Sequence, residues 1–254
     1  MTSNQPRILV WDIENAPIEA YVWEHWDTNV LHTIEDSYLL CAAYQWHGTG
    51  EPTRWIRKAK GKANDRELVL QIWSLLDEAD YVIGHNGDAF DQKKANTRFL
   101  KWGLGPPSPY VQIDTLKELR RHFKLASNKL DEAARFLDIG RKTAHAGIRL
   151  WLGCMANDEA AWSKMEEYNI QDVDLLIDVL EPLRPWIGHP GVAGARVNGQ
   201  QWTGVGTCTK LGCGSSDLIR RGSYRTKANV YQSYQCKVCG GYSRALLDDN
   251  GVLR

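Results

Sequence analysis

The chain has 254 residues, which is enough for one full α/β domain and a small second unit. Its hydrophobic content of 43% and charged content of 24% are ordinary for a globular protein, and no apolar run approaches membrane-spanning length. The N-terminal sequence MTSNQPR has no apolar stretch of the kind that directs secretion. These features argue against an integral membrane protein. We expect a reducing cytoplasm.

The formal net charge is zero, but the charges are unevenly distributed. Residues 1–183 carry 21 Lys and Arg against 28 Asp and Glu, a balance of −7. Residues 184–254 carry 10 against 3, a balance of +7. A basic tail is typical of a module that contacts phosphates, and an acidic body suits a site built from carboxylates. Charge alone also fits a tail that only aids solubility.

Apolar periodicity predicts strands and helices in a mixed order along the first 183 residues. Strands are expected at residues 7–14, 38–46, 53–57, 80–85 and 110–113. Helices are expected at residues 65–78, 90–102, 129–138 and 159–183. The second and third strands should form a hairpin, and Asn128 is a suitable N-cap for the third helix. This order resembles the ribonuclease H-like α/β fold, a mixed five-stranded sheet flanked by helices with the first strand at its centre.

Prolines and glycines follow the last predicted helix and indicate a connecting segment. We therefore expect a ribonuclease H-like domain at residues 1–185, a linker at 186–204 and a small cysteine-containing domain at 205–254.

Acidic residues lie at the ends of the predicted elements. Asp12 and Glu14 close the first strand, and because residues i and i+2 of a strand point to the same side, both carboxylates face one site. Asp91 falls in the first turn of the helix at 90–102. Either Asp91 or Asp88 can instead cap that helix, so this segment alone also fits a purely structural role.

A third acidic motif lies inside the last predicted helix. Tyr168 and Asp172 are four residues apart, which places the hydroxyl and the carboxylate on one helix face. Leu175, Leu176 and Val179 continue near that face, so it should be turned towards the body of the protein. A carboxylate aimed into a core needs a cation or another partner. In isolation the motif also fits a packed tyrosine and a peripheral acid.

The three motifs together predict one chemistry. Hydrolysis of a phosphodiester needs a nucleophile at neutral pH and stabilisation of the charge on the attacking and leaving oxygens. Two divalent ions about 3.5–4 Å apart supply both, and Mg²⁺ or Mn²⁺ prefers carboxylate oxygens. Acids from two strand ends and a late helix can form such a cage.

These segments resemble the three motifs of the DEDD exonuclease superfamily, in its tyrosine-containing DEDDy subclass. The matching positions are Asp12 and Glu14 for the first motif, Asn86 with Phe90 and Asp91 for the second, and Tyr168 with Asp172 for the third. The order and spacing agree over residues 7–183, and the stretch from Ser127 to Leu137, followed by Gly140-Arg141-Lys142, looks like phage and bacterial members. The extra acid Asp88 departs from the second motif.

The resemblance implies a metal-dependent 3′→5′ exonuclease that uses two Mg²⁺ or Mn²⁺ ions. Asp12 would bridge both ions, and Glu14, Asp91 and Asp172 would complete the ligands. Tyr168 would orient the attacking water. The implied substrate is a single-stranded or frayed 3′ end, with DNA favoured over RNA, and a replication or recombination protein is an expected partner. The alternative is a nucleic-acid-binding module that acts as an endonuclease or lacks catalysis.

Two basic stripes and several tryptophans are candidates for nucleic-acid contact. Lys94, Arg98 and Lys101 share one face of the helix after Asp91. Lys117, Arg120, Arg121 and Lys124 form another stripe. Trp23, Trp26 and Trp151 are able to stack on bases. Solvated helix faces and core tryptophans are the competing interpretations.

Four cysteines near the C-terminus have the spacing of a metal site. Cys208 and Cys213 form one pair, and Cys236 and Cys239 form a second pair, with 22 residues between the pairs. Four thiolates in two close pairs suit tetrahedral Zn²⁺, which would supply folding energy to so small a unit. Disulfides are disfavoured in a reducing compartment. The two remaining cysteines are read as core residues.

The segments around these cysteines look like zinc ribbons of transposase-type and other nucleic-acid-binding proteins. Basic residues interleaved with tyrosines lie between the two pairs, a composition that suits phosphate contact with stacking. The basic residues are Arg220, Arg221, Arg225 and Lys227. A ribbon that is purely structural, or that docks a protein, is the alternative.

Overall fold

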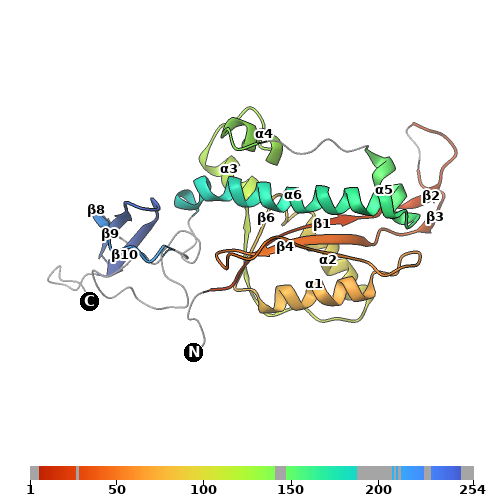
Figure 1. Ribbon diagram of the computed structural model, residues 1–254, viewed down its shortest axis with the longest axis horizontal. Helices are drawn as coiled ribbons and strands as arrows, with labels where there is room; N and C mark the ends of the chain where they lie inside the picture. The colour runs from red at the N-terminus through yellow and green to blue at the C-terminus, as the bar shows by residue number, and fades with distance from the viewer. Residues whose placement is uncertain are drawn as a thin grey trace. The chain divides into compact units, whose positions relative to one another are not determined.

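One mixed five-stranded sheet forms the body of the protein (Figure 1). The computed structural model describes residues 6–26, 29–140, 147–187, 208, 210, 213–225 and 230–246. The strands of this sheet are β1 (Ile8–Asn15), β4 (Leu39–Trp46), β5 (Arg54–Arg57), β6 (Tyr81–Gly84) and β7 (Val111–Asp114). They are arranged in the order β5-β4-β1-β6-β7, so the predicted central position of the first strand is confirmed.

The pairing of the strands follows from their connections. β1 and β4 are antiparallel, as are β4 and β5, which confirms the predicted hairpin. β6 is parallel to β1, and β7 is parallel to β6. Parallel neighbours need a crossover, and α1 and α2 provide it. The carboxyl ends of β1, β6 and β7 therefore meet at one edge of the sheet.

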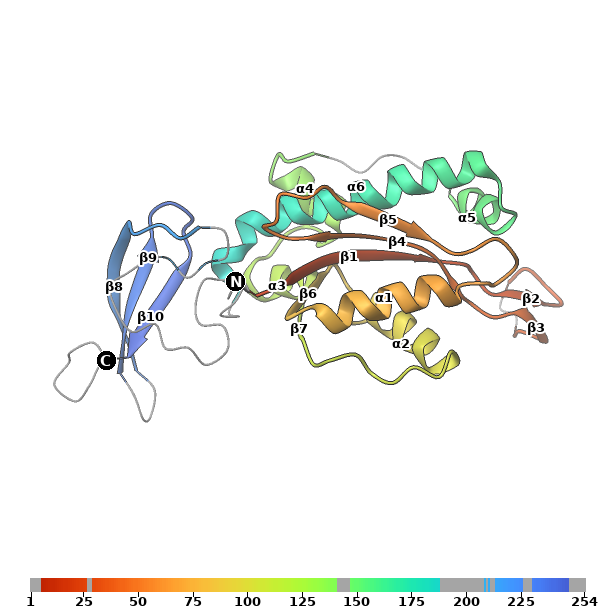
Figure 2. The ribbon, with the colours of Figure 1, turned by 60° about the horizontal axis from the view of Figure 1, so that its bottom comes forward.

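Helices cover both faces of the sheet. α1 (Arg66–Glu78) and α2 (Asp91–Lys101) lie on one face, and α6 (Glu159–Leu183) runs along the other (Figures 1 and 2). The core beneath α1 and α2 includes Leu9, Trp11 and Ile13 of β1. Because side chains alternate along a strand, the residues between these three face α6. This alternation puts Asp12 and Glu14 on the α6 side.

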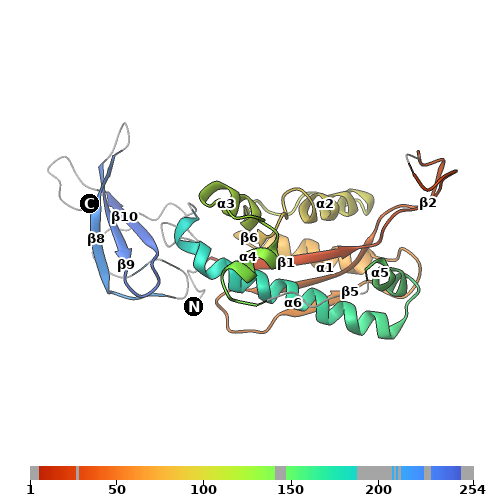
Figure 3. The ribbon, with the colours of Figure 1, turned by 90° about the horizontal axis from the view of Figure 1, so that it is seen from above.

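Several further elements complete the body. They are β2 (Glu19–Tyr21), β3 (His32–Glu35), α3 (Thr115–His122), α4 (Leu130–Phe136), α5 (Ile148–Met155) and the 3₁₀ turn η1 (Arg184–Trp186). β2 and β3 form a separate two-stranded ribbon beyond the end of β1, on the side where α5 also lies (Figure 3). β2, β3, α3 and α5 were not among the elements predicted from the sequence.

The prediction of Asn128 as the N-cap of the helix at 129–138 was wrong. The N-cap of α4 is Lys129, and no side-chain hydrogen bond closes the helix there. The neighbouring Asn128 instead forms a hydrogen bond through its backbone carbonyl with His85, with Nε2 and the oxygen 3.0 Å apart.

Among the described helices, none combines the length and apolar character that crossing a membrane requires.

The C-terminal unit contains a three-stranded antiparallel sheet in the order β10-β9-β8. Its strands are β8 (Leu218–Arg225), β9 (Val230–Cys236) and β10 (Tyr242–Leu246). Most of the predicted linker at 186–204 lies outside the described residues, so the predicted division into domains stays a prediction.

Candidate active site

Three of the four predicted acids converge between the sheet and α6. One carboxylate oxygen from each of Asp12, Glu14 and Asp172 lies within 4.8 Å of the others. Asp12 and Glu14 come from β1, and Asp172 comes from the buried face of α6, where it is 4% exposed. Three like charges at this separation repel each other, and a cation placed among them removes the repulsion. We call Asp12, Glu14 and Asp172 the acidic cluster.

Tyr168 lies one helical turn before Asp172 and faces the acidic cluster. Its pKa is raised far above the ordinary value, first because the phenol is buried and then because Asp172 and Glu14 are nearby negative charges. A hydrogen bond with Asp172 adds to the shift. The hydroxyl therefore keeps its proton at neutral pH, which suits a group that holds a water molecule by hydrogen bonding.

Two polar side chains hold the acids in place. The indole Nε1 of Trp151 donates to Glu14 Oε2 at 2.9 Å, and its ring makes an edge contact with Tyr168, with centroids 6.1 Å apart. The amide Nδ2 of Asn169, which is fully buried, donates to Asp12 Oδ2 at 2.8 Å. From the sequence, Trp151 was a candidate for base stacking or for the core, and Asn169 was not predicted to have a role. An amide inside a buried helix face is the signal that could have found Asn169.

Asp91 lies apart from the acidic cluster, although it borders the same strand. Its Oδ1 accepts the backbone N–H of Ile13, between the two β1 acids, at 3.4 Å. Burial, together with the charge of Asp114, raises the pKa of Asp91 to about 7. The structure thus brings three acids together and places the fourth against the backbone of β1.

The loop before Asp91 is shaped by a buried acid. Asn86 has a positive φ of 65°, and its backbone N–H donates to Asp114 Oδ1 at 2.8 Å. Asp114 also accepts the N–H of Leu116 at 3.0 Å, so its carboxylate fixes the backbone of this loop. Asp88 forms an ion pair with Lys117. Because each charge has a partner within the protein, neither residue is evidence for a metal or phosphate site.

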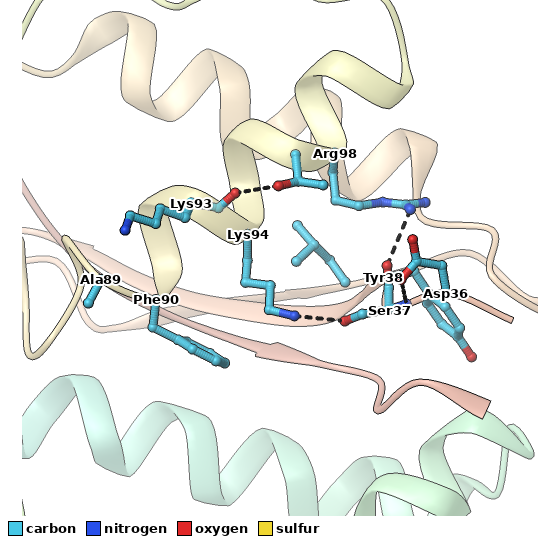
Figure 4. Close-up of a pocket in the computed structure, with 10 residues that line it drawn as sticks. Asp36, Ser37, Tyr38, Ala89, Phe90, Lys93, Lys94 and Arg98 are labelled. Carbon is cyan, nitrogen blue, oxygen red and sulfur yellow. Dashed lines mark hydrogen bonds between the residues drawn. The ribbon is translucent and has the colours of Figure 1, made fainter. Parts of the chain in front are cut away.

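One predicted phosphate contact needs correction. Arg98 is buried, and its guanidinium forms a two-point ion pair with Asp65, with nitrogen–oxygen distances of 2.6 and 2.8 Å. A guanidinium held in this way cannot reach a substrate phosphate. Lys94, from the same predicted stripe, is half-buried and lines a pocket beside α2 (Figure 4). Trp23 and Trp26 are each 84% exposed on the connection between β2 and β3.

The four cysteines near the C-terminus form a second cluster. Their sulfurs lie within 4.8 Å of one another, with Cys208 and Cys239 3.5 Å apart and Cys213 and Cys236 3.7 Å apart. A tetrahedral Zn²⁺ with bonds of about 2.3 Å requires sulfur separations of about 3.8 Å. The cluster therefore fits zinc.

Local backbone geometry brings each pair of cysteines together. A glycine with positive φ follows each pair, Gly214 after the first and Gly240 after the second. The N–H of Gly240 donates to the carbonyl of Cys236 at 2.9 Å. Burial raises the pKa of the Cys236 thiol, but the backbone amides of Cys239 and Val238 outweigh it and lower that pKa to about 7. A thiol of this kind loses its proton readily to a metal.

The basic residues between the cysteine pairs are only partly described. Arg220 and Arg221 are exposed on β8, where Arg220 donates to Gln232 and Arg221 to Gln235 of β9. The side chain of Arg225 and the whole of Lys227 lie outside the described residues. Phosphate contact by this unit stays a prediction.

Comparison with known proteins identifies one family and one shared fold. A sequence profile described as the RNase_H superfamily matches residues 27–184, a segment that contains Asp91, Tyr168 and Asp172 but begins after β1. No curated protein matches the sequence. The structure is similar to that of the family B DNA polymerase from the hyperthermophilic archaeon Pyrobaculum calidifontis, with a TM-score of 0.54 and 17% sequence identity. The similarity covers 71% of this chain but only 25% of the polymerase chain.

Proposed function

The chain belongs to the RNase H superfamily, and on this basis we propose that it is a metal-dependent nuclease that removes nucleotides from the 3′ ends of single-stranded or frayed DNA. The observation that carries the proposal is the acidic cluster with the Tyr168 hydroxyl beside it. Carboxylates are the ligands that Mg²⁺ and Mn²⁺ prefer.

The residues of the site have different roles in the proposed phosphodiester hydrolysis. Asp12, Glu14 and Asp172 would hold the divalent ions, and Asp91 would help to hold a second ion. Bound ions of this kind lower the pKa of water and stabilise charge on the attacking and leaving oxygens. Tyr168 keeps its proton and orients the attacking water. Water adds to phosphorus, the bond to the 3′ oxygen of the preceding nucleotide breaks, and a nucleoside 5′-monophosphate leaves.

Two donors keep these ligands in position before the substrate arrives. Trp151 fixes one oxygen of Glu14, and Asn169 fixes one oxygen of Asp12. Pre-oriented ligands reduce the reorganisation that accompanies the reaction.

The 3′ direction and the preference for DNA rest on the tyrosine-containing third motif and on the resemblance to DEDDy exonucleases. We also propose that the zinc-binding unit holds the nucleic acid through its exposed arginines, and that a replication or recombination protein is the partner in the cell. The net charge of +7 over residues 184–254 supports phosphate contact.

A degradation assay with labelled ends tests the proposal. A single DNA strand labelled at its 5′ end should give a ladder that shortens from the 3′ end in Mg²⁺ or Mn²⁺, and EDTA should stop it. A 3′-phosphorothioate cap should block the ladder. Products cut internally would show an endonuclease, and intact DNA bound tightly in both metals would show a binding module without catalysis.

A further inference from the structure

A groove of about 220 Å³ lies between α2 and the segment that leads into β4 (Figure 4). One wall is the segment of residues 36–39 that leads into β4, and the other is α2 with the two residues before it. Lys93 and Lys94 both contribute to the second wall. The groove is therefore lined by two lysines, and Phe90, the residue before Asp91, lines it as well.

Lys94 is tied to the carboxyl end of β1 through Ser37. Its Nζ donates to Ser37 Oγ at 3.3 Å, as Figure 4 shows. The same hydroxyl accepts Asn15 Nδ2 at 3.0 Å and donates to the carbonyl of Ala16 at 2.8 Å. Asn15 follows Glu14 directly in β1. The ammonium group is thus held at the point where the strand that carries the acids ends.

The wall opposite α2 is braced from inside the protein. The buried ion pair of Arg98 and Asp65 contacts the backbone of residues 36–39 at two points. Arg98 Nη1 donates to the carbonyl of Ser37 at 3.3 Å, and Asp65 Oδ2 accepts the N–H of Leu39 at 3.0 Å. The acid of this wall, Asp36, accepts the N–H of Ser37 at 2.7 Å. The groove is therefore formed before a ligand binds, and Arg98 serves it as a support.

We propose that this groove binds a backbone phosphate of the substrate strand through Lys94, at the carboxyl end of the strand that carries Asp12 and Glu14. The proposal rests on the proposed function, because it takes nucleic acid as the ligand. An ammonium has three donors, so Lys94 can hold a phosphate oxygen while it keeps its bond to Ser37. Lys93 adds a second positive charge at the same wall. The groove thereby positions the strand with its end at the acids.

Binding of a short fluorescent oligothymidylate in EDTA tests the groove independently of catalysis. Lys94→Gln keeps a polar side chain, one atom shorter, and removes its charge, and Lys94→Arg restores the charge. Lys101→Gln, at the exposed end of the same helix and outside the groove, is the matched control. We expect Lys94→Gln to weaken binding about tenfold. We also expect it to reduce the slope of log affinity against log salt by roughly 0.7.

Steady-state kinetics add a second readout. With Mg²⁺ present, Lys94→Gln should raise KM about tenfold and change kcat less than about twofold, while Lys94→Arg and Lys101→Gln stay close to the wild-type protein. Equal losses in Lys94→Gln and Lys101→Gln, or an unchanged salt slope in Lys94→Gln, would overturn the proposal. If the wild-type protein does not degrade DNA but Lys94→Gln still loses binding, the proposed nuclease function is contradicted and the proposed phosphate binding in the groove is supported.

Discussion

The acidic cluster and the cysteine cluster are assembled in opposite ways. The acids come from β1 and α6, 158 or more residues apart in the chain, and meet only when the sheet has formed and α6 has packed on it. The cysteines come from two short turns, each shaped by its own glycine. Carboxylates suit hard ions that are exchanged during a reaction, whereas thiolates suit a zinc ion that stays bound.

This difference separates what each cluster does for the protein. A pre-formed acidic cluster can lose an ion, or one acid, and leave the fold standing, because the apolar cores on both faces of the sheet hold β1 and α6 in place. The small three-stranded unit has few buried apolar residues among those described, so the cysteine cluster carries its stability. The fold of the C-terminal unit should depend on zinc, and the activity should depend on the divalent ions at the acidic cluster.

The largest expected effect is loss of structure in the C-terminal unit when zinc is removed. Structural zinc binding contributes on the order of 10 kcal/mol at neutral pH, more than so small a unit can replace. Cys236→Ser should abolish zinc binding, measured by metal analysis, and remove the dispersed β-sheet signals of this unit in amide NMR spectra. Gln235→Ala, on the same strand, should keep both. Retained sheet signals without zinc would contradict the structural role.

The next largest effect concerns the acidic cluster. Asp12→Asn should lower kcat at least about a thousandfold, because several kcal/mol of metal-based stabilisation is lost. The melting temperature should stay near that of the wild-type protein or rise, since a repelling charge is removed. Asp88→Asn, which removes the acid paired with Lys117, is the control and should keep nearly full activity. A large loss in Asp88→Asn instead would move the second motif from Asp91 to Asp88.

A smaller effect is expected at the tyrosine of α6. Tyr168→Phe keeps the ring against Trp151 but removes the hydroxyl that orients water, so kcat should fall about tenfold to a hundredfold with little change in KM. Tyr110→Phe removes a hydroxyl that donates to Gln92 and should leave kcat unchanged. Equal kinetics in the two variants would show that Tyr168 only packs.

The smallest effect tests the support of the acids. Trp151→Phe removes the N–H that holds Glu14, and about 1 kcal/mol predicts a fall in kcat of about fivefold with a higher Mg²⁺ requirement. Trp73→Phe loses a comparable bond to Gly105 on the other side of the sheet and serves as the control. A normal Mg²⁺ requirement in Trp151→Phe would mean that Glu14 is positioned without it.

Periodic segments of the sequence were enough to predict the sheet and its main helices. α6 has the predicted bounds, and the central place of β1 follows from the ribonuclease H-like order of the predicted elements. β2 and β3 were missed since they have three and four residues and expose their side chains, so no burial pattern marks them. α5 is short and exposes Ile148 and Leu152, which breaks its amphipathic pattern.

The site was predictable as far as its motifs are local. Spacing within β1 and α6 gave the three acids of the cluster and Tyr168. It could not show that Arg98 pairs with Asp65, 33 residues earlier, or that Trp151 reaches Glu14 across 137 residues, because such pairs depend on packing between helices and sheet. The same limit explains why Asp91 was expected among the ligands at equal rank.

Crystals soaked in Mn²⁺ test the central claim most directly. Anomalous scattering at the manganese edge should give a peak within coordination distance of Asp12, Glu14 and Asp172, with a weaker peak on the Asp91 side, and both should vanish in Asp12→Asn. A zinc signal should remain at the four cysteines in both proteins. Manganese that binds elsewhere, while the acidic cluster stays without a peak at saturating concentration, would contradict the account.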